Sequence, residues 1–196
     1  RRVEALLRSL ADLHALGIVH LDVKPSNFCG DLLLDYGLST FSGFELSPKV
    51  ATLNYKPPEL CEDRWSAGGG EAVDVWAAGC VMYEIIRSWL KESGYEVHKR
   101  RRLFNGKSKD EVRRQQRKFC RRLRAGRGVD WGLPDDARLR RRDKAMLAEA
   151  EMIMEAMMKE EGADRWTASE ALRRRRMLRR CRVRSGGHHA GDNKVV

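Results

Sequence analysis

The stretch HLDVKPSNF at residues 20–28 gathers four side chains that could take part in chemistry, namely His20, Asp22, Lys24 and Asn27. A carboxylate can orient a hydroxyl and accept its proton, and an amide oxygen can ligate a hard cation such as Mg²⁺. An ammonium group can lie beside a transferred phosphate. A second carboxylate, Asp35, follows a short apolar run, so one site built from the stretch and Asp35 is predicted.

This set meets the needs of phosphoryl transfer to a hydroxyl. The reaction requires a carboxylate that accepts the hydroxyl proton, a cation near the transferred phosphate, and oxygen ligands that hold Mg²⁺ on the other phosphates. Asp22 and Lys24 would supply the first two requirements, and Asn27 with Asp35 would supply the third. A single Asp or Asn in a proline-containing loop is ordinarily a turn former, so the interpretation depends on the whole set.

Helices before and after the stretch are expected to position these residues. Apolar residues recur at helical spacing over 3–13, and Gly17 stands where a helix stop belongs. Residues 72–86 are apolar on nearly every side, which for a helix indicates burial in the centre of a domain. Residues 144–158 repeat apolar residues at helical spacing, and Thr167 opens a capping box, so two further helices are predicted.

Little regular structure is expected between the stretch and the central helix. Residues 32–34 resemble a short buried strand, and a β-hairpin ahead of Asp35 could only be minimal, with its turn at Gly30-Asp31. Residues 38–58 are rich in Ser, Thr, Gly and Pro without a sustained period, which predicts a long loop.

Length and composition indicate one main globular domain. The 196 residues, 42% hydrophobic and 34% charged, suffice for a substantial core. No apolar run approaches the roughly 20 residues of a membrane helix, and no signal peptide is evident. The 5 cysteines do not suggest a disulfide framework or a zinc knuckle. A reducing compartment, cytoplasmic or nuclear, is expected, with no membrane partner.

The net charge of +11 belongs to the C-terminal half of the chain. Such an excess would suit an acidic partner or a nucleic acid, but aromatic residues do not interleave with the basic ones, so nucleic acid is not favoured. A charge run is ordinarily only a solvated face. Residues 112–145 are therefore interpreted as a basic, helical elaboration. The basic clusters lie at 99–102, 113–125, 138–144 and 173–184.

At these residues the sequence resembles the eukaryotic protein kinases. HLDVKPSN is similar to their catalytic loop H-R-D-x-K-x-x-N, and DYG at 35–37 is similar to their metal-binding D-F-G motif. TLNYKPPEL at 52–60 resembles the T-x-x-Y-x-A-P-E close of the activation segment, with Pro57 in place of Ala. DVWAAGCVMYEI at 74–85 and DRWTASEAL at 164–172 resemble the D-x-W-x-x-G central helix and the R-x-T-A-x-E-A-L segment.

The resemblance implies a mainly α fold. Residues 1–180 would form the C-terminal lobe of a protein kinase domain with a minimal β-hairpin, and 181–196 would be a basic, disordered tail. No glycine-rich G-x-G-x-x-G loop or V-A-I-K lysine precedes the catalytic loop, so the N-terminal lobe is expected to be absent from this chain. Phosphoryl transfer by the 196 residues alone is therefore expected to stay at background.

The resemblance also implies ATP and Mg²⁺ as cofactors and a protein substrate. Asp22 would be the catalytic base, and Lys24 would contact the γ-phosphate. Thr52 with Lys24 would set Asp22 and the substrate hydroxyl, which is the serine/threonine pattern. Asn27 and Asp35 would hold the metal and, with Lys24, the nucleotide. LFNGKSKDE at 103–111 adds a similarity to the cyclin-dependent and related kinases.

Other positions are expected to serve structure. Asp74 would hold the catalytic-loop backbone, Glu59 would pair with Arg165, and His20 would pack and hydrogen-bond rather than act as a base. Leu21 stands where many kinases carry an arginine that pairs with a phosphate on the activation segment, and leucine cannot do so. Two hypotheses stay open: part of a serine/threonine kinase, or a non-catalytic, pseudokinase-like module whose basic half binds an acidic or phosphorylated partner.

Overall fold

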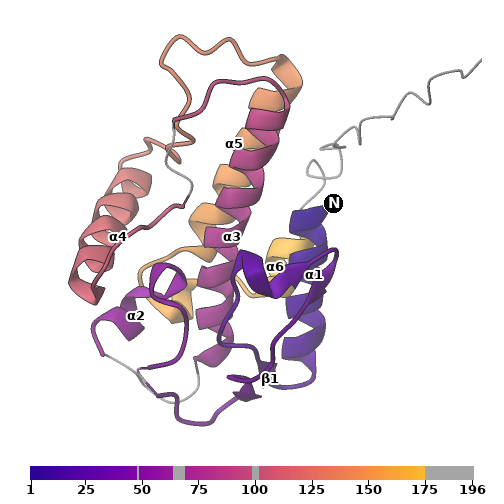
Figure 1. Ribbon diagram of the computed structural model, residues 1–196, viewed down its shortest axis with the longest axis vertical. Helices are drawn as coiled ribbons and strands as arrows, with labels where there is room; N and C mark the ends of the chain where they lie inside the picture. Colours follow the sequence, from indigo (N-terminus) through magenta and orange to yellow (C-terminus); the bar gives the residue numbers. More distant parts are fainter. Residues whose placement is uncertain (48, 64–68, 99–101, 175–196) are drawn as a thin grey trace, which may run out of the picture.

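The computed structural model describes residues 1–47, 49–63, 69–98 and 102–174, in which helices surround one long helix (Figure 1). Regular strands are short and few in this part of the chain, so the predicted mainly α fold is confirmed. The α-helices are α1 (Arg2–Ala15), α2 (Pro58–Cys61), α3 (Gly70–Glu92), α4 (Lys109–Arg124), α5 (Arg141–Met157) and α6 (Ala168–Arg173). The 3₁₀ turns are η1 (Pro25–Asn27), η2 (Leu53–Tyr55) and η3 (Gly162–Asp164).

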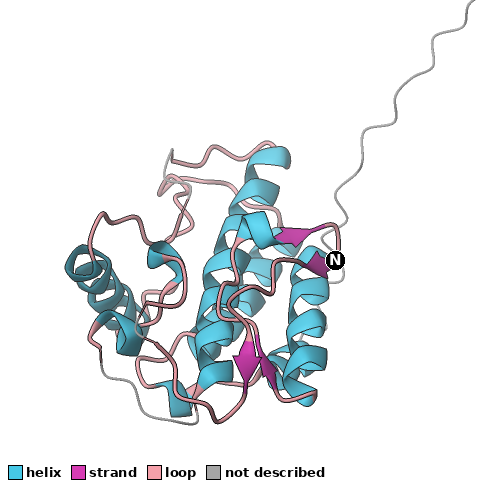
Figure 2. Cartoon of the chain, turned by 60° about the horizontal axis from the view of Figure 1, so that its bottom comes forward, coloured by secondary structure: helices cyan, strands magenta, loops and turns pink. Residues whose placement is uncertain are grey.

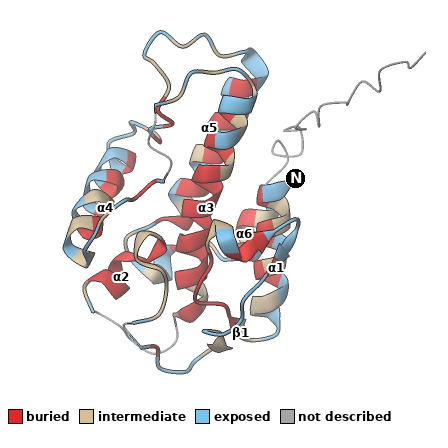
Figure 3. Cartoon of the chain, in the orientation of Figure 1, coloured by how far each residue is buried: buried red, intermediate tan, exposed pale blue. Residues whose placement is uncertain are grey.

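Helix α3 is the centre of the core, as its sequence predicts. It is buried around most of its circumference, and Trp76 and Met82 are almost completely enclosed (Figure 3). The absence of a side chain at Gly79 allows Met158 to pack closely against α3, because a Cβ atom at residue 79 would lie 2.7 Å from the Met158 sulfur. The apolar residues of α3 thus face neighbours on several sides, which is the reason for the missing amphipathic period.

Helix α1 packs against α3 and α6 through the leucines that recur along it. It ends just before Gly17, whose φ of +68° is the left-handed conformation that glycine adopts readily. The predicted capping box also forms at the start of α6. The Thr167 side chain accepts a hydrogen bond from the Glu170 amide, and the Glu170 carboxylate accepts one from the Thr167 amide.

The basic region after α3 is helical only in part. Helix α4 lies against α2 and η2, whereas residues 125–140 are irregular. The prediction of a helical elaboration over 112–145 is therefore wrong for 125–140. Gly126 and Gly128 both have positive φ, which ends the helix. Helix α5 follows, and its methionines mostly face the core.

Two small antiparallel sheets lie beside the helices (Figure 2). Strand β1 (Ile18–Val19) pairs with β4 (Thr40–Phe41), and β2 (Phe28–Cys29) pairs with β3 (Leu32–Leu33). The second pair is the predicted minimal hairpin, and its turn uses Gly30 at φ +62°. In the described part of the long loop predicted at 38–58, the other regular elements are η2 and the start of α2.

No helix in the described ranges is long and apolar enough to cross a membrane. The predicted tail at 181–196 and the domain boundary at 180 lie outside the described residues.

Candidate active site

The backbone of the predicted catalytic loop is fixed by Asp74 on α3. Its carboxylate is fully buried and accepts hydrogen bonds from the backbone amides of His20 at 2.7 Å and Leu21 at 2.8 Å. The His14 Nε2 atom lies 3.1 Å from the same carboxylate. These bonds hold Leu21 at φ +66°, a conformation that costs a bulky residue about 1–3 kcal/mol. The predicted role of Asp74 is confirmed.

His20 is a structural residue, as the sequence predicts. It is fully buried, its Nε2 lies 3.0 Å from the Leu34 carbonyl oxygen, and its Nδ1 accepts a hydrogen bond of 3.2 Å from the Asp22 amide. Its ring also lies against the ring of Tyr36, with 5.1 Å between centroids. Through these two hydrogen bonds the imidazole joins the predicted catalytic loop to the segment that carries Asp35.

Asp22, Lys24 and Thr52 form a closed set of hydrogen bonds, although Thr52 is distant in sequence. The Lys24 ammonium donates to Asp22 Oδ2 at 2.6 Å, and the Thr52 hydroxyl donates to Asp22 Oδ1 at 2.6 Å. Lys24 Nζ also lies 3.3 Å from Thr52 Oγ1. The structure therefore brings together the three residues for which the sequence predicts catalytic roles.

The surroundings of Asp22 keep its carboxyl group ionised. Burial by itself would raise the pKa of Asp22, but the hydrogen bonds from Lys24 and Thr52 and the Lys24 charge outweigh burial and lower that pKa below its ordinary value. At neutral pH the group is a carboxylate, which is the form that can orient a hydroxyl and accept its proton.

Asn27 is oriented by the same carboxylate. It closes η1, where Pro25 occupies the first position, and its Nδ2 donates to the Asp22 carbonyl oxygen at 3.1 Å and to Asp22 Oδ2 at 3.2 Å. The amide oxygen is not used in these bonds, and among the described residues it receives a long hydrogen bond of 3.4 Å from Ser26. This oxygen is a hard donor of the kind Mg²⁺ prefers.

The β2–β3 hairpin brings Asp35 back toward Asn27. The Leu34 amide donates to the Asn27 carbonyl oxygen at 2.8 Å, so Asp35 follows directly after a backbone contact with Asn27. Asp35 is exposed, has φ +62°, and accepts a hydrogen bond of 3.4 Å from the Gly37 amide. Both predicted metal ligands thus offer oxygen atoms that fit Mg²⁺, which commonly takes one or two protein carboxylates together with phosphates and water.

Metal ligands beyond these two do not gather in the described parts of the chain. No group of three or more His, Cys, Asp or Glu residues there could hold a metal ion.

An apolar cluster occupies the place where a phosphate-binding arginine is common in the resembled family. Leu21 is 2% exposed and packs against Leu46, Leu60 and Val73. Leu46 belongs to the long loop after Asp35, so this cluster fixes that loop to α3 without a charge. The sequence indicated the loss of the arginine but not its apolar substitute, because Leu46 is an isolated leucine in an aperiodic loop.

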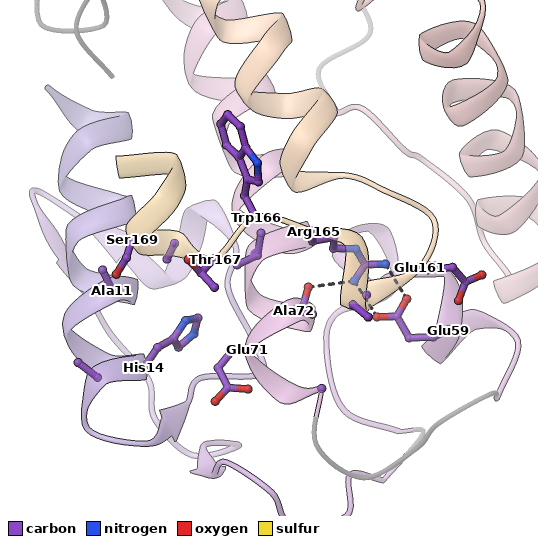
Figure 4. Close-up of a pocket in the computed structure, with 16 residues that line it drawn as sticks. Ala11, His14, Glu59, Glu71, Ala72, Glu161, Arg165, Trp166, Thr167 and Ser169 are labelled. Atoms are coloured by element: carbon purple, nitrogen blue, oxygen red, sulfur yellow. Dashed lines mark hydrogen bonds and ion pairs between the residues drawn. The ribbon is translucent and has the colours of Figure 1, made fainter. Parts of the chain in front are cut away.

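The predicted ion pair between Glu59 and Arg165 is present. Arg165 Nη1 and Nη2 donate to the two Glu59 carboxylate oxygens at 2.7 and 2.8 Å, and Nη1 also donates to the Ala72 carbonyl oxygen (Figure 4). The guanidinium lies 5.0 Å from the centre of the Trp76 ring. Since the guanidinium is fully enclosed, the pair anchors α2 to the region after α5 and has a structural role.

A cavity of about 1020 Å³ lies beside this pair, between α1, α6 and the start of α3 (Figure 4). His14, Glu71 and Thr167 contribute polar atoms to its wall. As far as the described residues form that wall, it includes neither Asp22 nor Asp35, so the cavity is separate from the candidate active site.

A family model and several individual proteins are similar to this chain in sequence. The family model of the protein kinase domain matches residues 1–176. Stress-activated protein kinase JNK of Drosophila melanogaster is 39% identical over 89 residues, which are 42% of this chain and 23% of that protein. Mitogen-activated protein kinase 14 of Xenopus laevis is 37% identical over 86 residues, 41% of this chain and 23% of that protein.

A probable cyclin-dependent serine/threonine-protein kinase of Dictyostelium discoideum is 37% identical over 98 residues, 47% of this chain and 7% of that protein. The chain thus spans less than a quarter of the length of each of these relatives.

Proposed function

Because the chain belongs to the protein kinase domain family, we propose that it is the C-terminal lobe of a serine/threonine kinase that transfers phosphate from ATP to protein hydroxyls. The observation that carries the proposal is the closed set of hydrogen bonds among Asp22, Lys24 and Thr52. A lobe that served only as a scaffold would have no need to hold an ionised carboxylate in this position.

In the proposed reaction Asp22 orients the substrate hydroxyl and accepts its proton. Thr52 and Lys24 hold the carboxylate, and the Lys24 ammonium is placed to neutralise charge on the transferred phosphate. The Asn27 amide oxygen and the Asp35 carboxylate would hold Mg²⁺. Bound ATP with Mg²⁺ would supply the phosphoryl group and balance its negative charge.

The proposal includes a second, ATP-binding upper lobe that this sequence does not contain. Six of the eight large hydrophobic residues that are exposed in the described chain lie within 32–44, next to Asp35. Leu32 is 67% exposed and Phe41 is 63% exposed. A concentration of this kind is typical of a surface that another protein unit covers. The 196 residues alone are therefore expected to transfer no phosphate above background.

The test joins the chain to the upper lobe of a related kinase and titrates ATP in the presence and absence of Mg²⁺. We expect metal-dependent ATP binding that Asp35→Ala abolishes. The matched control is Asp31→Ala, which removes an exposed carboxylate from the neighbouring turn and should leave ATP binding unchanged. Absence of ATP binding at millimolar concentration would contradict the proposal and favour a non-catalytic module.

A reducing location, cytoplasmic or nuclear, is proposed as well. Cys29, Cys61, Cys80 and Cys120 are free thiols, which supports it. Burial raises the pKa of Cys61 to about 11, so that thiol is also unreactive at neutral pH.

A further inference from the structure

From Arg114 to its end at Arg124, the outward face of α4 carries only basic charge. Its exposed residues recur every three to four positions and therefore lie on one side of the helix, opposite the buried Val112, Phe119 and Leu123. No Asp or Glu occurs anywhere between 112 and 129. This surface, called the basic ridge below, consists of Arg114, Arg117, Lys118, Arg121, Arg122 and Arg124.

The flank of the ridge already binds carboxylates of the same chain. The buried Arg113 donates hydrogen bonds to both Glu62 and Glu160. The hydrogen bond from Arg113 and the positive charge of Arg113 lower the pKa of Glu160. Arg117 also pairs with Glu62 at 3.0 Å, and Arg124 pairs with Glu160 at 3.2 Å. Helix α4 thus presents arginines at spacings that carboxylates from other segments can bridge.

The middle of the ridge has no such compensation. Arg114, Lys118 and Arg121 form no ion pair with any described residue. Like charges four positions apart on a helix destabilise it by a few tenths of a kcal/mol per pair. These charges therefore do not stabilise α4, and their concentration on one exposed face indicates a role in contact with another molecule.

The dimensions and composition of the ridge favour a peptide over a nucleic acid. From Arg114 to Arg124 the helix rises roughly 15 Å, with basic groups at each turn of about 5.4 Å. An extended peptide places side chains of one side about 6.8 Å apart, so acidic residues at alternate positions can meet successive turns. The ridge carries no exposed aromatic residue on which a base could stack. Of the two side-chain amides in α4, Gln116 is buried and Gln115 is hydrogen-bonded to the backbone of Asn105.

We propose that the basic ridge is a docking surface for an acidic, extended segment of a protein partner. Where that partner is a substrate, the inference rests on the proposed kinase function, and docking then raises the local concentration of the hydroxyl near Asp22. The docking contact itself requires neither ATP nor an upper lobe, so it can be measured on the 196-residue chain.

The experiment follows fluorescence anisotropy of a labelled peptide of alternating Glu and Ser, about ten residues long. The test variant combines Arg114→Glu, Lys118→Glu and Arg121→Glu. The control combines Arg138→Glu, Arg141→Glu and Lys144→Glu, which changes the net charge equally at exposed residues outside the ridge. We expect the test variant to lose at least about ten-fold in affinity and the control to lose less than about three-fold.

Other outcomes would overturn the inference. Equal losses of peptide affinity in the two triple variants would mean that binding depends on net charge alone. A peptide of alternating Gln and Ser that bound as tightly as the Glu–Ser peptide would exclude recognition of carboxylates. Tighter binding of a single-stranded oligonucleotide than of the acidic peptide, lost in the same test variant, would assign the ridge to nucleic acid. A thermal melt tests whether the test variant is still folded. Since the substitutions remove like charges from α4, they should not lower its melting temperature.

Discussion

The two halves of the candidate active site are built differently. Asp22 is 6% exposed, and its side chain and loop are held by residues from distant elements, namely Thr52 in the long loop and Asp74 in the central helix. Asp35 is exposed, and the Leu34 amide and the His20 ring hold the backbone just before it. The Asp22 half is held by contacts to the core, whereas the Asp35 carboxylate accepts one long hydrogen bond of 3.4 Å, from the neighbouring Gly37 amide.

This difference indicates which parts of the site the lobe can position by itself. The Asp22 half has its hydrogen bonds in place before any substrate arrives, so it loses little conformational entropy on binding. The Asp35 carboxylate faces solvent, and in the proposed function its partner is a metal ion. Perturbations of the first half should therefore reduce stability, whereas perturbations of the second half should reduce ligand binding and leave stability nearly unchanged.

The largest expected effect is that of Asp74→Ala. The change leaves the buried amides of His20 and Leu21 without acceptors, and each such group costs about 1–3 kcal/mol. We expect the free energy of unfolding to fall by about 4 kcal/mol, as measured by urea denaturation. The control is Asp12→Ala, on the exposed side of α1, where a change above about 0.5 kcal/mol is not expected.

Leu21→Ala is expected to be nearly as costly. The residue is buried against Leu46 and Leu60, and removal of a buried leucine side chain costs about 2–5 kcal/mol. Leu16→Ala, at a leucine that is 72% exposed, is the matched control. A double-mutant cycle with Leu46→Ala should give a coupling free energy above about 0.5 kcal/mol. Additive effects would contradict the conclusion that the cluster fixes the long loop.

Thr52→Val should have a smaller effect. Valine keeps the shape of threonine but removes the hydroxyl that donates to Asp22, and a hydrogen bond to a charged group contributes about 1.5–3 kcal/mol. Because Lys24 remains, we expect a loss near the lower limit, about 1.5 kcal/mol, in urea denaturation. Thr40→Val, at a half-buried threonine in β4, should change the free energy of unfolding by less than about 0.5 kcal/mol.

Much of the fold and of the candidate site could be predicted from the sequence, because the motifs occur in the order that the resembled family has. The uniform apolar character of 72–86 predicts the central helix, and Gly30-Asp31 predicts the hairpin turn. The Glu59–Arg165 pair and the role of Asp74 follow from the family resemblance alone, since no local pattern links residues so far apart. The geometry of Asp22 with Thr52 likewise depends on how a long loop returns to the core.

The features that the sequence did not predict depend on contacts between segments with weak local signals. Leu46 has no periodic neighbours, so its packing against Leu21 is decided by tertiary structure. The end of α4 was missed because the basic composition of 112–145 continues past Gly126, although the helix does not. The ion pairs of Glu62 and Glu160 with Arg113 were not predicted either, because the three residues lie in separate segments of the chain.

The pH dependence of the free energy of unfolding should show how much the ionised Asp22 carboxylate stabilises the fold. The pKa of Asp22 in the folded state lies below its ordinary value of 3.8, so its carboxylate stabilises the fold above that value. This stabilisation is lost as the pH falls through the lower, folded-state pKa. In denaturation series from about pH 6 to about pH 2, Asp22→Asn should therefore be less stable than the native sequence at the upper end, with a difference that narrows toward the lower end. A constant difference across the series would contradict this account.

The smallest expected effect on stability is that of Asp35→Asn, which repeats the same substitution in the other half of the site. Asparagine adopts positive φ as readily as aspartate does, so the backbone at Asp35 is not strained by the change. The carboxylate is exposed, and the free energy of unfolding should change by less than about 0.5 kcal/mol at neutral pH. In the chain joined to an upper lobe, however, the same substitution should weaken Mg²⁺-dependent ATP binding, because a neutral amide is a poorer ligand for Mg²⁺ than a carboxylate is. If Asp35→Asn instead destabilised the lobe as much as Asp22→Asn did, Asp35 would belong to the framework, and the distinction between the two halves would fail.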